Sequence, residues 1–358
     1  MADLTTHICG LTLAHPIMPG AGPPVRDGAA LLACAQGGAA ALVTKTISVK
    51  AANVPAPNMA DFKSYFLNTE LWSELSPEQW LEVEYPVTKT AGLPIIVGLG
   101  YTAEDIAWLA PKVAPFADAI ELSTHYIDDD PRPMQDAVRA AKEGTGLPVL
   151  VKMSPFREPQ AAARAAQEAG ADAIVATNSF GPAFGVDIEH GGRPWMGGKG
   201  YGWISGPALK PIALRMVYDI AHVVDIPVIG VGGISTATDV VEYLMAGARA
   251  VQVCTAAITK GPGIYGKLAV QLDAWLDKHG YAGVDAIYGL SLKQAIPQMT
   301  QPPVLLPERC TGCNLCVTSC VYGALYLEEK KIHIHAEHCE KCGLCLSRCP
   351  VAALQPPG

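Results

Sequence analysis

The sequence predicts an α/β protein in which a (β/α)8 barrel is followed by a small, cysteine-rich α+β domain. Short apolar runs recur eight times within the first part of the chain, and stretches of helical periodicity separate them. Alternation of this kind over about 250 residues or more is typical of an eight-stranded parallel barrel. Eight of the 11 cysteines fall after residue 308, which sets the end of the chain apart.

The eight runs are mainly apolar along their whole length, as expected of strands that are buried on both faces of a parallel sheet. They lie near Ile17-Met18, Ala41–Thr44, Ile95–Gly98, Ala119–Leu122, Val149–Lys152, Ala173–Thr177, Val228–Gly230 and Ala250–Val253. Helices are expected between them, for example over 103–114, 158–169 and 236–246. A doubly wound open sheet is the competing fold, but no G-x-G-x-x-G follows the first strand, which weakens its dinucleotide-binding version.

Three of the connections that follow strands are unusually long. They cover about 47–76, the segment that starts at Ser123 and carries Asp128–Asp130, and 179–203. In a barrel the chemistry lies where strands end, and long loops without structure of their own are usually functional. We expect these three loops to build the site, and the last is a candidate for a mobile cover.

The final domain repeats the spacing C-x2-C-x2-C-x3-C, which is the spacing of bacterial ferredoxins that hold two [4Fe–4S] clusters. One cluster is expected on Cys310, Cys313, Cys316 and Cys349, and the other on Cys339, Cys342, Cys345 and Cys320. Zinc or disulfides are weaker alternatives, because zinc sites place their ligands at wider separations. Such clusters move single electrons.

Proline marks the boundary between the two parts. We expect the barrel over 1–296, a Pro-rich linker over 297–307 and the ferredoxin-like domain over 308–358. Within that domain 324–338 is predicted as a hairpin, with alternation over 331–335. Its three histidines, His333, His335 and His338, are interpreted as polar positions of a half-exposed sheet rather than metal ligands.

Bulk properties exclude some functions. A net charge of −8 argues against a nucleic-acid binder. No apolar run reaches the ~18 residues that span a bilayer, and the first residues lack the pattern of a signal peptide. We therefore expect a cytoplasmic protein without a membrane or nucleic-acid partner. Iron–sulfur clusters imply a reducing compartment, so Cys9, Cys34 and Cys254 should be free thiols.

The last two barrel units contain candidate phosphate-binding segments. Gly232-Gly233-Ile234 follows the seventh strand and Cys254-Thr255 follows the eighth, so backbone N–H groups can approach an anion there. Two lysines, Lys45 and Lys152, end the second and fifth strands. A cation in a barrel mouth is costly unless a ligand needs it, and a reduced flavin carries a negative charge that it would stabilise.

At this level of detail the sequence resembles the flavin-plus-iron–sulfur part of dihydropyrimidine dehydrogenase, within the dihydroorotate dehydrogenase family. The resemblance rests on segments from both parts of the chain: Cys9–Thr12, Thr44–Thr46, Phe66–Asn68, Ala119–Leu122, Thr177-Asn178, Ile204–Gly206, Lys210–Arg215, Gln252–Cys254 and the tail. It implies FMN contacts at Gly20, Ala21, Lys45, Thr46, Lys152, Gly206, Gly232, Gly233, Ile234, Cys254 and Thr255. It implies polar substrate contacts at Asn68, Ser123, Asn178 and Ser179, where amides can pair with ring C=O and N–H groups.

The loop after the fourth strand departs from the family pattern Glu-Leu-Asn-x-Ser-Cys-Pro. Ser123 stands in place of the substrate-binding asparagine, and Tyr126 in place of the cysteine that exchanges a proton with substrate. Reduction of a C=C bond needs a hydride from flavin N5 on one carbon and a proton on the other. His125 and Tyr126 are the local candidates for that acid. Alternatively, His125 and Tyr126 only pack in the loop. The aspartates that follow are interpreted as solvated, and Glu121 as a buried structural carboxylate.

The sequence therefore predicts an FMN and iron–sulfur oxidoreductase that acts on a C–C bond next to a carbonyl. A cyclic amide or another conjugated carbonyl compound fits as substrate, and an external ferredoxin or an NAD(P)H-oxidising flavoprotein partner should exchange electrons with the clusters. A genuine dihydropyrimidine dehydrogenase or dihydroorotate oxidase with a shifted acid is the first alternative. An electron-transfer subunit whose flavin relays electrons to a partner is the second alternative, and a barrel that has lost its flavin is the third. The resemblance also implies a homodimer.

Overall fold

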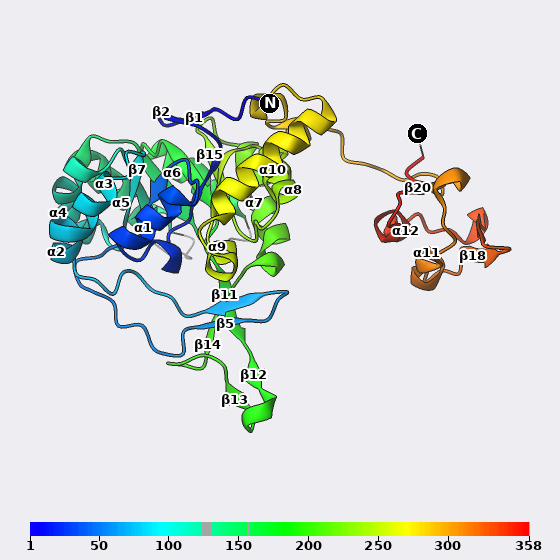
Figure 1. Ribbon diagram of the computed structural model, residues 1–358, viewed down its shortest axis with the longest axis horizontal. Helices are drawn as coiled ribbons and strands as arrows, with labels where there is room; N and C mark the ends of the chain where they lie inside the picture. The colour runs from blue at the N-terminus through cyan, green and yellow to red at the C-terminus, as the bar shows by residue number, and fades with distance from the viewer. Residues whose placement is uncertain (124–129, 156–157, 358) are drawn as a thin grey trace. The chain divides into compact units, whose positions relative to one another are not determined.

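The computed structural model describes residues 1–123, 130–155 and 158–357 (Figure 1). It divides into two compact units, Met1–Lys293 and Gln294–Gly358. The first unit is the barrel and the second contains the repeated cysteines.

Eight parallel strands form one sheet in the order β3-β16-β15-β10-β9-β8-β7-β4. They are β3 (Ile17–Pro19), β4 (Leu42–Val43), β7 (Ile95–Leu99), β8 (Ala119–Ser123), β9 (Val149–Met153), β10 (Ala173–Ala176), β15 (Val228–Val231) and β16 (Ala248–Val253). The two end strands meet, because the backbone N–H of Ala40, just before β4, donates to the carbonyl of Ile17 at 3.1 Å. The predicted barrel and all eight predicted strand positions are confirmed, and the open sheet is not formed.

Helices surround the barrel strands (Figure 1). They are α1 (Gly28–Gln36), α2 (Pro77–Gln79), α3 (Tyr85–Lys89), α4 (Ala103–Val113), α5 (Arg132–Thr145), α6 (Pro159–Glu168), α7 (Lys210–Ala221), α8 (Ala237–Met245), α9 (Thr255–Lys260) and α10 (Ile264–His279). Capping boxes start α4 and α8, where Thr102 and Thr236 exchange hydrogen bonds with the aspartates three residues later. The three helices predicted by periodicity are α4, α6 and α8.

A short hairpin at the start of the chain packs against the interior of the barrel. Strands β1 (Thr6–Ile8) and β2 (Leu11–Leu13) pair, and Ile8 and Leu13 are buried in the same cluster as Leu150 of β9 and Ile229 of β15. This interior cluster combines branched apolar side chains with alanines, so the barrel is a packed core rather than a pore.

Two of the long connections are more ordered than the sequence suggested. Strands β5 (Met59–Asp61) and β6 (Phe66–Asn68) lie in the connection that follows β4. Strands β11 (Phe180–Phe184) and β14 (Tyr201–Ser205) lie in the connection that follows β10. They form one antiparallel sheet in the order β11-β14-β6-β5, and β12 (Val186–Asp187) and β13 (Arg193–Pro194) add a hairpin. The expectation of loops without structure of their own was wrong. Each connection forms a pair of strands, and the β6–β14 pairing that joins them spans more than 100 residues, which leaves no local signal. The register places Asn68 opposite Trp203.

The second unit is built from two similar halves. It contains β17 (Val304–Leu305), α11 (Leu315–Ser319), β18 (Leu325–Glu328), β19 (Lys331–Ile334), α12 (Leu344–Arg348) and β20 (Leu354–Gln355). The predicted hairpin is β18–β19, and β17, inside the Pro-rich stretch, pairs with β20. Cys316, Leu325, Ile332 and Leu354 form its small core. Among the described residues of both units, no helix combines the length and apolar character needed to cross a bilayer.

Candidate active site

A cavity of about 460 Å³ opens at the carboxyl ends of the barrel strands, and its lining includes residues of the four-stranded antiparallel sheet. This volume lies in the range of small-molecule and cofactor sites. The predicted residues that line it are Ala21, Lys45, Thr46, Asn68, Ser123, Lys152, Asn178, Ser179, Gly206, Gly232, Gly233, Ile234, Cys254 and Thr255. Gly20 lies behind this lining, against Gln252 and Cys254. His125 and Tyr126 lie outside the described residues.

Lys45, which follows β4, is paired with a carboxylate that sequence reasoning did not single out. Its Nζ lies 2.5 Å from Glu70 Oε2, and Asn58 Nδ2 donates to Glu70 Oε1 at 2.6 Å. The lysine and glutamate side chains are only 3% and 12% exposed. Glu70 thus offsets the cost of burying the Lys45 cation and presents a negative acceptor to the cavity. Its position two residues after Asn68 was the signal available in the sequence, since alternate residues of an extended segment share a side.

Lys152, at the end of β9, belongs to a second buried network. Its Nζ donates to Gln252 Oε1 at 3.1 Å and lies 3.3 Å from Glu121 Oε1, while Gln252 Nε2 donates to the other Glu121 oxygen. The Glu121 side chain is fully buried. Glu121 therefore compensates a cation of the cavity, which supports its interpretation as a structural carboxylate.

The amide side chains of Asn68 and Asn178 both line the cavity. Asn68 Nδ2 donates to the Trp203 carbonyl at 3.2 Å, which ties β6 to β14. Asn178 Nδ2 lies 3.4 Å from Ser123 Oγ, and its backbone N–H donates to the Met153 carbonyl. Asn68 Oδ1 also accepts from the Glu70 N–H at 3.4 Å. Each amide thus keeps a second N–H and at least one acceptor lone pair for a ligand.

The glycines at the other end of the cavity have backbone conformations that favour this residue. The φ angles of Gly206, Gly232 and Gly233 are 73°, 133° and 69°. A Cβ at Gly233 would lie 2.8 Å from the Gly206 carbonyl oxygen, so the two turns approach each other closely. Thr255 Oγ1 donates to Ser205 Oγ at 3.0 Å and joins the start of α9 to this region. The result is a cradle of backbone groups without side chains, which fits a phosphate.

Aromatic residues that were not predicted as site residues also line the cavity, among them Trp72 and Tyr101. Trp72 and Tyr101 pack edge to face with ring centroids 4.9 Å apart, and Trp72 Nε1 donates to the Lys50 carbonyl at 2.6 Å. Burial raises the pKa of Tyr101 to about 12, so its phenol is protonated at neutral pH. Nothing in their local sequence distinguishes them from core aromatics.

The cysteines of the second unit gather around two separate hollows. One is lined by Cys310, Cys313, Cys316 and Cys349. The other is lined by Cys320, Cys339, Cys342 and Cys345, with Cys316 at its edge. These groups correspond to the two ligand sets predicted from the spacing. Burial raises the pKa of Cys345 to about 11, with the neighbouring Cys342 adding to the effect.

The protein matches known families over both units. A family model described as dihydroorotate dehydrogenase matches residues 3–276, which is most of the barrel unit. The chain belongs to the dihydroorotate dehydrogenase family. A second model, described as a 4Fe-4S dicluster domain, matches residues 309–353.

Curated relatives share the barrel over nearly their whole length. The catalytic subunit of dihydroorotate dehydrogenase B (NAD(+)) from Methanothermobacter thermautotrophicus is 34% identical over 301 residues, which are 80% of this chain and 98% of the relative. The subunits of the same name from Pyrococcus abyssi and Geobacter sulfurreducens are also 34% identical, and cover 81% and 80% of this chain and 99% and 97% of the relatives.

This member of the dihydroorotate dehydrogenase family is a flavin- and iron–sulfur-dependent oxidoreductase of CH–CH groups. About a fifth of it has no counterpart in these relatives, which are themselves covered almost completely. The dicluster domain lies beyond the part matched by the barrel family. In this chain, therefore, a barrel of the dihydroorotate dehydrogenase family and an iron–sulfur domain occur in a single polypeptide.

Proposed function

We propose that this chain uses FMN and two [4Fe–4S] clusters to add or remove two electrons across a C–C bond next to a carbonyl of an uncharged cyclic amide. The observation that carries the proposal is one cavity that combines a glycine cradle at one end with Lys45, Glu70 and two asparagines elsewhere in its lining. The glycine cradle suits the phosphate of the cofactor, and the polar side chains suit the substrate.

The residues around the cavity fit FMN. Gly206, Gly233 and the Cys254–Thr255 turn would hold the phosphate, since they line the same cavity and the Gly206 and Gly233 turns approach each other too closely for a side chain at Gly233. Lys45 and Lys152 would hold the polar edge of the ring. When bound, FMN supplies hydride transfer to or from the substrate and single-electron exchange with iron–sulfur clusters. A sealed or very small cavity, which a pure electron-transfer subunit would have, does not describe this barrel.

The polar side chains favour an uncharged ring over an anionic one. Glu70 accepts hydrogen bonds from Lys45 and Asn58 and can also accept from a ring N–H. Asn68 and Asn178 would pair with ring C=O and N–H groups and orient the carbon that reacts. A substrate carboxylate near Glu70 would meet a like charge, because the Lys45 cation is already compensated.

We propose that the loop after β8 supplies the group that exchanges a proton with the substrate. His125 or Tyr126 would exchange it with the carbon next to the one that exchanges hydride. Tyr126 stands in the position where the family pattern has cysteine. Ser123 begins this loop and is fixed by Asn178. A positioned acid contributes roughly 10²–10⁴-fold to rate.

Electrons would leave or enter through the second unit. We assign one cluster to Cys310, Cys313, Cys316 and Cys349 and the other to Cys320, Cys339, Cys342 and Cys345, in agreement with the two hollows. An external ferredoxin or an NAD(P)H-oxidising flavoprotein would be the partner. The relatives are named as catalytic subunits of an NAD(+)-linked enzyme, which supports a flavoprotein partner.

Dihydroorotate oxidation is the second candidate, and the relatives' name favours it. Dihydropyrimidine reduction, with uracil or thymine as substrate, is one case of the reaction on an uncharged cyclic amide that we propose. The test is anaerobic incubation of the oxidised protein with dihydrouracil or dihydroorotate, and of the reduced protein with uracil or orotate, while flavin absorbance is followed. Flavin bleaching or reoxidation by the neutral pair supports our proposal. A response to the dihydroorotate pair alone would replace it with the second candidate.

A further inference from the structure

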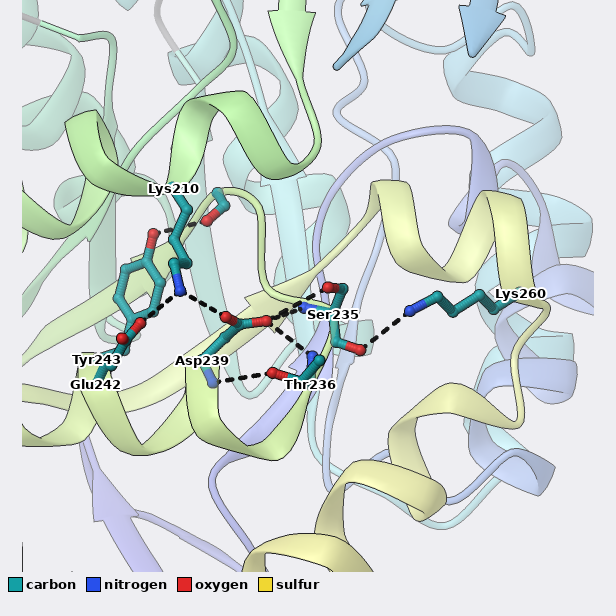
Figure 2. Close-up of polar contacts among 8 residues, drawn as sticks. Lys210, Ser235, Thr236, Asp239, Glu242, Tyr243 and Lys260 are labelled. Atoms are coloured by element: carbon teal, nitrogen blue, oxygen red, sulfur yellow. Dashed lines mark hydrogen bonds and ion pairs between the residues drawn. The ribbon is translucent and has the colours of Figure 1, made fainter. Parts of the chain in front are cut away.

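The turn after β15, residues 232–236, is held from one side by α8. Tyr243 Oη donates to the Gly232 carbonyl at 2.7 Å, and Asp239 Oδ2 accepts from the backbone N–H groups of Ser235 and Thr236 at 2.9 and 2.8 Å (Figure 2). The N–H groups of Ser235 and Thr236, just before α8, are therefore occupied by the protein's own carboxylate. An anion at this turn has to find donors other than these two.

Lys210, at the start of α7, is also committed to this side of the turn. Its Nζ lies 2.7 Å from Asp239 Oδ1 and 2.5 Å from Glu242 Oε2 (Figure 2). Two carboxylates face this one cation, so its charge is fully compensated. Lys210 stabilises the turn and has no positive charge left to offer a ligand.

Lys260 approaches the same turn from the opposite side. It is the last residue of α9, and its Nζ donates to the Ser235 carbonyl at 3.1 Å (Figure 2). It lines the cavity together with Gly206, Gly233 and Thr255. In the part of the chain that the structure describes, no carboxylate lies within ion-pair distance of Lys260, whereas Lys45 and Lys152 each contact one.

The charge of Lys260 is thus uncompensated at the glycine-lined end of the cavity. An ammonium carries three N–H donors and the Ser235 carbonyl takes one, so two remain for a ligand. A neutral carbonyl partner holds the side chain toward the turn without cancelling its charge. An anionic group seated between the 206 and 233 turns would meet this cation.

We propose that Lys260 is a specificity-determining residue whose ammonium binds the terminal phosphate of FMN and makes the site prefer FMN to riboflavin. The inference rests on the proposed function, which places the phosphate at the glycine cradle. A charge-assisted contact of this kind adds to the backbone hydrogen bonds and acts only on the phosphorylated flavin.

The test compares two flavins in the full-length chain. Flavin-free wild type and Lys260→Gln are titrated with FMN and with riboflavin, and flavin fluorescence gives the two dissociation constants. We expect the variant to bind FMN about tenfold more weakly, as for a partly exposed charge-assisted contact, and riboflavin equally well. Its FMN affinity should also depend less on salt. Lys260→Arg, which keeps a phosphate-binding cation, should retain most of the preference.

The controls separate this role from a general one. Lys267→Gln removes an exposed lysine of α10 outside the cavity lining and should leave both affinities unchanged. An unchanged ratio of the two affinities in Lys260→Gln, or an equal loss of both, would overturn the assignment of Lys260 alone. Failure of the wild type to bind either flavin would overturn the proposed function and this inference with it.

Discussion

Lys45 and Glu70 form an ion pair of 2.5 Å at the mouth of the barrel, although they come from segments 25 residues apart. The pair sets the electrostatic character of the cavity. Without Glu70 the site would present a buried, unbalanced cation, and with it the site presents a polar but nearly neutral surface beside Asn68. This balance is the physical reason for proposing an uncharged cyclic amide as substrate.

Replacement Glu70→Gln should shift substrate preference. The variant keeps the side chain's size but frees the charge of Lys45 and weakens an acceptor for a ring N–H. We expect kcat/KM for dihydrouracil to fall by roughly 10–100-fold, as when a charged hydrogen bond is lost, and the ratio of dihydroorotate to dihydrouracil activity to rise. Steady-state kinetics with both substrates measure this. Glu74→Gln, an exposed neighbour, serves as the control, and an unchanged ratio in Glu70→Gln would contradict the role of the carboxylate.

The buried Lys152–Glu121 pair should behave as a coupled unit. Lys152→Met leaves the fully buried Glu121 without its cation, and loss of one partner of such a pair costs about 3–5 kcal/mol in the free energy of unfolding. The double variant Lys152→Met with Glu121→Gln should recover most of that loss. Urea unfolding of the wild type, the two single variants and the double variant measures the coupling. Additive losses in the double variant would show that the two groups do not compensate each other.

The arrangement of the eight tail cysteines predicts which cluster each substitution removes. Cys349→Ala should abolish the cluster of the first motif, because Cys349 shares a hollow with Cys310, Cys313 and Cys316 despite its distance in sequence. Iron per chain should fall to about half, as for one of two cubanes. Electron paramagnetic resonance should lose one signal. Cys9→Ser, in the barrel unit, should change neither quantity; full iron content in Cys349→Ala would refute the pairing.

His15 should make the barrel less stable in acid. Its Nδ1 accepts from the backbone N–H of Ile17 at 3.3 Å and its Nε2 lies 3.0 Å from the Gly38 carbonyl, which together fit the neutral ring. Burial lowers the pKa of His15 from its usual 6.5. The unfolded chain therefore takes up the proton first, so stability is present above pH 6.5 and is lost as pH falls through the folded pKa.

The measurement for His15 is the melting temperature of wild type and His15→Gln between pH 8 and pH 5. The wild type should lose more stability than the variant over the acidic part of this range, whatever their difference at pH 8. Parallel curves would mean that His15 titrates alike in the folded and unfolded chain.

Much of the fold could be predicted because its signals are local. Every barrel strand is a short, mainly apolar run, and each tail motif carries its spacing within a few residues. The sheet of β5, β6, β11 and β14 could not be predicted, because Phe66–Asn68 pairs with Trp203–Ser205 across more than 100 residues. The same distance hid the environment of Asn68, whose amide is fixed by the Trp203 carbonyl.

The candidate site divides in the same way. Lysines and glycines at strand ends were predictable, since strand ends in a barrel converge on one mouth. The partners that set their charge were not, because Glu70 and Gln252 reach the lysines only after the strands are arranged in space. The proposed proton-transfer residues, His125 and Tyr126, remain a prediction from the sequence.

The cofactor content of the full-length protein tests the proposed electron path most directly. Anaerobically purified and reconstituted protein should contain about one FMN and two cubane clusters per chain, as determined by flavin release, iron analysis and absorption spectra. Material that holds iron in the tail but takes up no FMN would contradict the central claim.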